Sequence, residues 1–216
     1  MRSKPGRAPH EFSEAHPPAA MLSSSMGVVS ATRPRTSKRP PAAPGSLSGL
    51  DPALDLERMA DLAAFTARSL RTVRPRPFGA SIVHTKTGNV LLRALNAVAQ
   101  EFDPSSHAEV RAIRKATKRL RQLSLSGYTL YTTCEPCPMC MSAALWAGLD
   151  RIVYGATIED ANRHCSQIRI PAAEVAARSD MACVVDGPVL RDQCYALFTH
   201  PQMLRAFRLW STRKRK

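Results

Sequence analysis

Residues 128–156 read YTLYTTCEPCPMCMSAALWAGLDRIVYGA, with two extended apolar segments on either side of a helical one. Residues 128–133 and 151–156 are rich in β-branched, aromatic and aliphatic side chains, which is typical of buried strands. Residues 137–149 have the length and apolar content of a helix, and prolines mark its entry. This stretch therefore predicts a strand, a helix and a second strand in direct succession.

Periodic patterns predict further elements on both sides of this unit. A first helix is expected to begin at Asp51 and Pro52, which suit an N-cap and a first turn. Its inward face is expected to consist of Leu56, Met59, Ala60, Ala63, Ala67 and Leu70. The other predicted elements are a hairpin over residues 81–85 and 90–95, a helix over 107–123, a short helix over 171–178, an edge strand over 182–185 and a last helix that ends near Pro201.

Strands and helices alternate after the hairpin, which is typical of α/β proteins. We therefore predict a three-layer α/β/α sandwich with a mixed central sheet, formed by residues 51–204. Residues 1–50 hold eight of the 17 prolines and nine serines, a composition that predicts a disordered extension. Residues 205–216 are expected to form a basic C-terminal tail.

The 216-residue chain has a formal net charge of +14, and this charge is unevenly distributed. Residues 1–50 carry seven basic and two acidic side chains, and residues 205–216 carry six basic and no acidic ones, which leaves +3 for residues 51–204. The charge therefore says little about the substrate. No stretch approaches the roughly 18–20 apolar residues that a membrane span needs, and we expect no membrane association. The six cysteines show no disulfide framework and no export signal is evident, so a cytoplasmic location is expected.

Two short motifs carry chemistry: His107-Ala108-Glu109 and the segment CEPCPMC over residues 134–140. Cys137 and Cys140 are three residues apart, so they share one helical face and can hold one ion, with His107 as a third ligand. Three protein ligands of the N and S type leave a fourth tetrahedral position for water, which is typical of a catalytic zinc site. Glu109 is then placed to accept a proton from that water and to donate it to a leaving amine.

Each motif alone also has a structural interpretation. Residues 106–109 fit a capping box in which Glu109 caps a helix. A single CxxC pair also occurs in redox sites and structural zinc sites, and an iron–sulfur cluster would need a cysteine where Ala144 stands. In combination, however, the motifs fit H-x-E…P-C-x-x-C, the signature of zinc-dependent nucleobase deaminases. We therefore favour the catalytic interpretation.

Over about residues 55–200 the sequence resembles the cytidine/deoxycytidylate deaminase superfamily. The resemblance implies a cytidine deaminase-like fold, a homodimer or larger oligomer, and one Zn²⁺ per subunit held by His107, Cys137 and Cys140. It also implies that Glu109 is the catalytic proton shuttle, and that hydroxide on the zinc displaces the exocyclic amine as ammonia.

Within the superfamily, the motif Pro77-Phe78-Gly79-Ala80 and Trp146 resemble the guanine deaminase branch. The resemblance implies a small-molecule purine substrate, most simply guanine converted to xanthine, with substrate contacts from Asn96, Phe78, Ala108 and Trp146. Three features depart from that branch. Arg76 stands where glycine is usual, Ala94-Leu95 lacks the glycine usual before the asparagine, and residues 158–180 match neither branch well.

Two other functions remain open from the sequence. A tRNA-specific adenosine deaminase, which forms inosine at the wobble position, is suggested by the basic residues of the predicted 107–123 helix: Arg111, Arg114, Lys115, Lys118, Arg119 and Arg121. Because Val110, Ile113 and Leu120 are expected to form the buried face, these charges are what a solvated outer face would show, and we favour that interpretation. The last alternative is a non-enzymatic, zinc-stabilised nucleic-acid-binding protein.

Overall fold

The computed structural model describes residues 51–213. The predicted disordered extension over residues 1–50 lies outside the described residues, as do residues 214–216. No helix among the described residues is long and apolar enough to cross a membrane.

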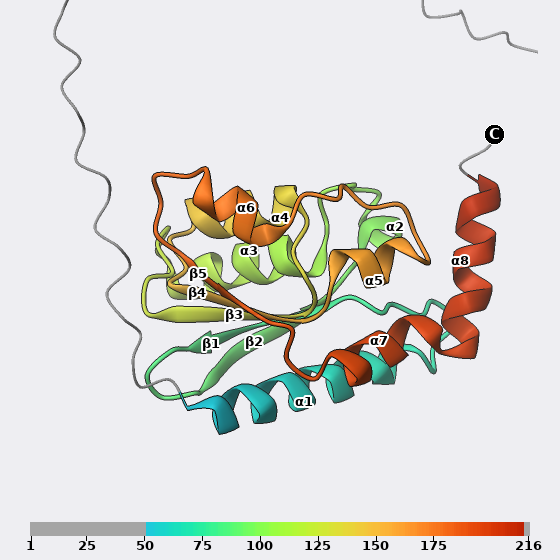
Figure 1. The fold of residues 1–216 in the computed structure, drawn as a ribbon, viewed down its shortest axis with the longest axis horizontal. Coiled ribbons are helices and arrows are strands. Elements are labelled where there is room, and N and C mark those ends of the chain that lie inside the picture. Colours follow the sequence, from blue (N-terminus) through green and yellow to red (C-terminus); the bar gives the residue numbers. More distant parts are fainter. Residues whose placement is uncertain (1–50, 214–216) are drawn as a thin grey trace, which may run out of the picture. The chain divides into compact units, whose positions relative to one another are not determined.

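A five-stranded mixed sheet forms the centre of the domain (Figure 1). The strand order is β2-β1-β3-β4-β5, with antiparallel pairing between β2, β1 and β3 and parallel pairing between β3, β4 and β5. The strands are β1 (Gly79–His84), β2 (Val90–Leu95), β3 (Tyr128–Cys134), β4 (Arg151–Ala156) and β5 (Val184–Asp186).

Helices cover both faces of this sheet. Figure 1 shows α3, α4 and α6 on one face and α1 and α7 on the other. The prediction of a three-layer sandwich with a mixed sheet is therefore confirmed. The helices are α1 (Pro52–Ser69), α2 (Val98–Glu101), α3 (Ala108–Leu120), α4 (Pro138–Trp146), α5 (Ile158–Asn162), α6 (Ala172–Ala177), α7 (Arg191–Thr199) and α8 (Pro201–Arg213).

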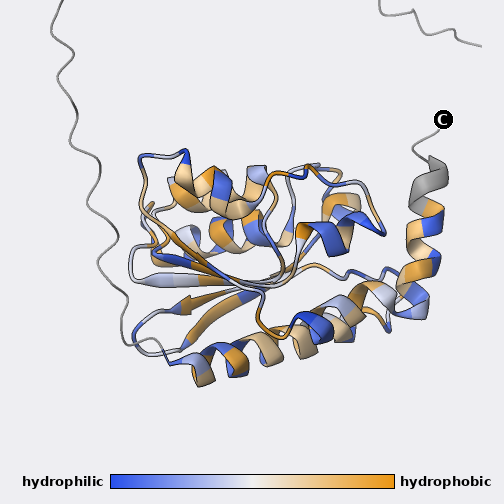
Figure 2. Ribbon diagram, in the orientation of Figure 1, coloured by the Kyte–Doolittle hydropathy of each residue, from blue (hydrophilic) through white to orange (hydrophobic). Residues whose placement is uncertain are grey.

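Each face of the sheet carries its own hydrophobic core. Ile82 belongs to the core under α3 and α4, which includes Met141, whereas its neighbour Val83 belongs to the core under α1 and α7, which includes Met59 and Phe198. This alternation follows from the two-residue period of a strand. Figure 2 shows the matching pattern on the covering helices α1 and α3, where hydrophobic and hydrophilic residues alternate around the helix.

The first helix begins as predicted, because the Asp51 side chain accepts a hydrogen bond from the backbone N–H of Ala53 at 2.8 Å. The predicted inward face is wrong at Leu56, which is 49% exposed, while Leu62 is fully buried in the core. The inward face instead includes Asp55, whose carboxylate forms a bidentate ion pair with Arg151 on β4. The inward face thus includes a charged residue that hydrophobicity alone does not predict.

The C-terminal region differs from the basic tail that the sequence predicts. α7 ends just before Pro201 as predicted, but Pro201 then occupies the first position of α8, where its missing N–H costs no hydrogen bond. Met203 and Phe207 are buried in the core that contains Phe198. The predicted end of the domain at residue 204 therefore falls inside a helix, and residues 205–213 belong to that helix.

The Asp55–Arg151 pair generates a prediction about stability. Burial alone raises the pKa of Asp55, but hydrogen bonds from Arg151 and Tyr131 hold it below its ordinary value of 3.8. The substitution Asp55→Ala should lower the free energy of unfolding at pH 7 by about 3 kcal/mol, because it leaves a buried guanidinium without its bidentate partner. Urea denaturation measures this change.

Asp61→Ala serves as the control, since Asp61 forms exposed ion pairs with Arg58 and Arg93 and should contribute less than about 1 kcal/mol. A carboxylate with a lowered pKa stabilises the fold above its unfolded-state pKa, and that contribution is lost as the pH falls through its folded-state pKa. The difference between wild type and Asp55→Ala should therefore shrink below about pH 4. Equal effects of the two substitutions would contradict this account of Asp55.

Candidate active site

Two helices begin beside each other at the end of β3, and each carries one of the two motifs. His107 is the N-cap of α3, with extended backbone angles and a half-buried side chain. Cys137 is the N-cap of α4, Pro138 occupies the first helical position, and Cys140 lies one turn further on. The proline fits because the first N–H of a helix has no intrahelical partner.

The three potential ligand atoms form a compact triangle. His107 Nδ1 lies 3.7 Å from Cys137 Sγ and 3.5 Å from Cys140 Sγ, and the two sulfur atoms are 3.6 Å apart. A tetrahedral zinc ion with bonds of about 2.3 Å to sulfur and about 2.0 Å to nitrogen places neighbouring ligand atoms about 3.5–3.8 Å apart. The donor set and its spacing therefore fit zinc, and the structure brings together all three residues that the sequence predicts as ligands.

The site also favours the anionic form of one ligand. The pKa of Cys137 is lowered to about 4, first by its hydrogen-bonding contact with Cys140 Sγ and also by the contact with His107, which outweigh burial. Metal ions bind the thiolate rather than the thiol. Cys137 is thus ready to bind a cation at neutral pH.

Glu109 lies in the first turn of α3 and is only 5% exposed. Its Oε1 accepts a hydrogen bond from Thr132 Oγ1 at 3.1 Å, while its Oε2 is 3.6 Å from Cys140 Sγ. Burial raises the pKa of this carboxyl above its ordinary value. One oxygen is thus anchored to β3 and the other faces the ligand triangle.

The capping-box alternative is wrong. The N-cap of α3 is His107 rather than Ser106, and the Ser106 hydroxyl donates to Glu101 Oε2 at 2.5 Å and to Asp103 Oδ2 at 3.0 Å. Because the Glu109 carboxylate instead accepts from Thr132, its burial has no capping explanation.

The four predicted substrate contacts are distributed over different elements. The Asn96 backbone N–H donates to the Phe78 carbonyl at 3.0 Å, and Asn96 Oδ1 accepts from the Val98 N–H at 3.2 Å. Phe78 is half-buried and packs edge-on against Phe198, with ring centroids 5.2 Å apart. Ala108 is fully buried in the first turn of α3. The substrate-binding roles of these residues stay predictions.

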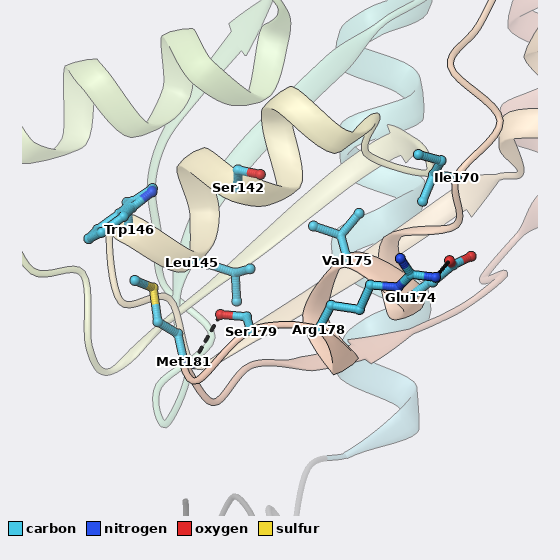
Figure 3. A pocket seen from close by; sticks show the side chains of 9 residues that line it. All are labelled: Ser142, Leu145, Trp146, Ile170, Glu174, Val175, Arg178, Ser179 and Met181. Atoms are coloured by element: carbon cyan, nitrogen blue, oxygen red, sulfur yellow. Dashed lines mark hydrogen bonds and ion pairs between the residues drawn. The ribbon is translucent and has the colours of Figure 1, made fainter. Parts of the chain in front are cut away.

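Trp146 lies at the other end of α4 from the ligand cysteines and is 79% exposed. It lines a surface pocket of about 370 Å³ between α4 and α6, together with Leu145, Ile170, Val175 and Met181 (Figure 3). Its predicted contact with substrate is not evident within the single chain and stays a prediction.

Sequence reasoning missed two residues that support the site. Thr132 anchors Glu109 across α3 and β3. Glu135 lies inside the cysteine motif, and its carboxylate accepts from the backbone N–H groups of Ile158 and Ala172 at 3.1 and 2.9 Å. It thereby ties the ligand loop to the starts of α5 and α6. The strand alternation that buries Leu130 was the one signal for Thr132, since it places residue 132 on the same face.

Comparison with known proteins agrees with this geometry. Residues 54–156 match the model of the cytidine and deoxycytidylate deaminase zinc-binding region. The tRNA-specific adenosine deaminase of Bacillus subtilis is 36% identical over 118 residues, which cover 55% of this chain and 70% of that protein. The chain belongs to the cytidine and deoxycytidylate deaminase family. Family membership and the donor set together indicate zinc as the cofactor.

Other members of this family are also similar to the chain. The guanine deaminase of Bacillus subtilis is 48% identical over 85 residues, which cover 39% of this chain and 53% of that protein. The match thus spans about half the length of that relative. A solved guanine deaminase from Nitrosomonas europaea shares the fold, with a TM-score of 0.60 and 23% identity over 70% of this chain and 83% of that chain.

The geometry of the site predicts that His107, Cys137 and Cys140 all bind the zinc ion. Cys140→Ser should lower the zinc content of the purified protein from about one ion per chain to a small fraction, because the site loses a thiolate. Cys183→Ser is the matched control, since Cys183 is a half-buried free thiol beside β5. Elemental analysis by mass spectrometry measures both. Full zinc occupancy in Cys140→Ser would disprove the assignment of that ligand.

Proposed function

We propose that the protein is a hydrolytic deaminase that replaces an exocyclic amino group on a purine ring with oxygen. Water and the ring-bound amine are consumed, and the ring carbonyl and ammonia are formed. The observation that carries this proposal is the buried Glu109 carboxyl, held by Thr132 with its second oxygen 3.6 Å from Cys140 Sγ. A zinc ion held by His107, Cys137 and Cys140 would supply the acidification of water that makes it a nucleophile at neutral pH.

In this proposal Glu109 moves the protons. Its Oε2 accepts the proton that water loses, and the protonated carboxyl then donates to the departing amine, so the carboxylate is restored when ammonia leaves. Burial suits this role because it favours the protonated form during the interval between the two steps. The hydrogen bond from Thr132 keeps the carboxyl in place without occupying Oε2.

Guanine is the substrate that we propose first, with xanthine as the product. The identity with the Bacillus subtilis guanine deaminase supports it, as does the direct link between Phe78 and Asn96. In this arrangement Phe78 offers an apolar surface for a planar ring, and the Asn96 amide offers polar atoms for its edge. The expected cytoplasmic location stays a prediction.

Wobble adenosine in tRNA is the second candidate, supported by the relative in Bacillus subtilis that acts on tRNA. Three of the basic side chains of α3 weigh against it. Arg111 and Arg114 form ion pairs with Glu101 and Asp103 at 2.7 and 3.2 Å, and Arg119 donates to the Leu91 carbonyl. Cations that are already paired have less to gain from phosphate contacts.

A homodimer is also proposed, and the surface around Trp146 supports it. Trp146 and Ile170 are 79% and 41% exposed and line the same pocket, and exposed apolar surface of this kind favours association. Trp146→Glu should convert a dimer to a monomer in light scattering after size exclusion. Leu123→Glu, at a site 90% exposed outside the pocket, should leave the mass unchanged. A Trp146→Glu protein that keeps the wild-type mass would contradict this interface.

The catalytic proposal is tested by Glu109→Gln in the zinc-loaded protein. We expect kcat to fall by about 10²- to 10⁴-fold, because the amide cannot transfer protons, while zinc content stays unchanged. Glu159→Gln, on the exposed side of α5, should keep full turnover. Unchanged activity in Glu109→Gln would contradict the proposal and would favour a zinc-stabilised binding protein.

The substrate is identified by ammonia release from guanine, adenine, cytosine, their nucleosides and a tRNA anticodon stem-loop. We expect turnover of guanine. Turnover confined to the stem-loop would replace guanine by tRNA adenosine, and a zinc-loaded protein that releases no ammonia from any of them would refute the deaminase itself.

A further inference from the structure

We propose that Arg76 contacts the substrate and recognises the O6 and N7 acceptor edge of guanine, so that it selects guanine over 2-aminopurines that lack the O6 acceptor. This inference rests on the proposed function, and it assigns a role to a residue outside the ligand triangle and Glu109.

The backbone around Arg76 is held at the end of the sheet that carries the candidate site. The Ser69 hydroxyl donates to the Arg76 carbonyl at 2.6 Å and accepts from the Arg76 N–H at 3.2 Å. The next carbonyl, that of Pro77, accepts from Thr133 Oγ1 at 3.1 Å. The Phe78 carbonyl, two residues after Arg76, accepts from the Asn96 N–H at 3.0 Å, so this loop borders a residue predicted to contact the substrate. Arg76 is thus fixed by its backbone, and its side chain takes no part in holding the loop.

Within residues 51–213 the Arg76 guanidinium has no hydrogen-bond or ion-pair partner. Its Nε is buried and makes no hydrogen bond, although the side chain as a whole is only half-buried. Among the ion pairs of residues 51–213, none includes Arg76. Arg58 also has a buried Nε without a partner, but its terminal nitrogens bind Glu57 and Asp61. Arg76 has no such compensation within the described residues.

The neighbouring guanidinium of Arg111 makes it more costly for Arg76 to have no partner among the described residues. Burial and the neighbouring charge of Arg111 both lower the pKa of Arg76. Arg111 itself is satisfied, since it binds the Glu101 carboxylate and the Leu95 carbonyl. Leu95 pairs with Gly79, three residues after Arg76, so the Arg111 side chain reaches the end of β1 at which Arg76 lies. A charge that is partly removed from water is costly unless a partner pairs with it, so this guanidinium is set to gain from a ligand that brings acceptors.

The arrangement of N–H donors on a guanidinium indicates which ligands Arg76 can bind well. A guanidinium presents its N–H groups as a planar fork that matches two adjacent acceptors, and O6 and N7 of guanine are the base edge it binds most often. That edge lies across the ring from C2, so Arg76 can contact it while Glu109 acts on the 2-amino group. A 2-aminopurine with an amino group at position 6 presents a donor there, as adenine does, which the guanidinium disfavours.

The test compares two purines that carry the same 2-amino group. 2-Aminopurine keeps N7 but lacks O6, whereas guanine has both acceptors. Arg76→Ala should lower kcat/KM for guanine by roughly 10- to 100-fold, mainly through KM, and change that for 2-aminopurine by much less. Arg76→Lys should recover only part of the loss, because an ammonium lacks the fork. Arg74→Ala, on the exposed part of the same loop, should match wild type for both purines.

Thermal unfolding without substrate provides a second measurement. Arg76→Ala should unfold at the wild-type temperature or above it, because no hydrogen bond or ion pair of this side chain is lost.

The outcomes separate this inference from the proposed function. Wild-type protein that binds zinc but releases no ammonia from guanine refutes the guanine proposal, and the Arg76 assignment falls with it. If wild type acts on guanine, three results overturn the Arg76 assignment alone: unchanged kinetics in Arg76→Ala, equal losses for guanine and 2-aminopurine, or a loss confined to guanosine monophosphate. The last result would assign Arg76 to a phosphate group.

Discussion

Three donor atoms of His107, Cys137 and Cys140 have to lie within about 4 Å of one another, and this requirement determines how the domain is arranged around β3. A histidine and two cysteines some 30 residues apart in sequence can meet only if the two helices that carry them begin at the same point. α3 and α4 do so because both pack on the same face of the sheet. The hydrophobic core under these helices thus fixes the ligand triangle.

Glu109 depends on the same packing. Its burial follows from its position in the first turn of α3, directly over β3, and Thr132 offers the one side-chain hydrogen bond that the described residues give to its Oε1. The Glu109 carboxyl is buried, one of its oxygens is held by Thr132, and the other faces the ligand atoms. These are the features of a group that transfers protons. A different polar contact, the Asp55–Arg151 ion pair, lies at the opposite end of the sheet. The ion pair that stabilises the fold is therefore separate from the residues of the candidate active site.

Much of this arrangement could be predicted from local patterns. The Asp51 cap, the hairpin around Gly88 and the two helices that carry the motifs depend on neighbouring residues, and the structure confirms them. The ligand spacing could be predicted because a CxxC pair on one helix needs no long-range contact. Gly79 in the PFGA motif has a packing reason, since a side chain there would collide with Thr66 on α1.

The features that the sequence does not predict depend on contacts between residues that are far apart in the chain. The inward face of α1 includes Asp55, which is paired with a residue 96 positions away. α8 was missed although it carries several apolar residues, because Met203 and Phe207 become buried only in the core that contains Phe198 on α7. Thr132 looks ordinary in the sequence, and Arg76 stands out there only as a departure from the guanine deaminase branch. The fold alone brings Thr132 beside Glu109 and leaves Arg76 without a partner among the described residues.

The most direct test of the central claim, that this site uses water to remove an amino group, is the reaction of guanine with the zinc-loaded protein in water enriched in ¹⁸O. Hydrolytic deamination predicts one labelled oxygen at C2 of xanthine for each ammonia released. Ammonia release with unlabelled xanthine would contradict the account.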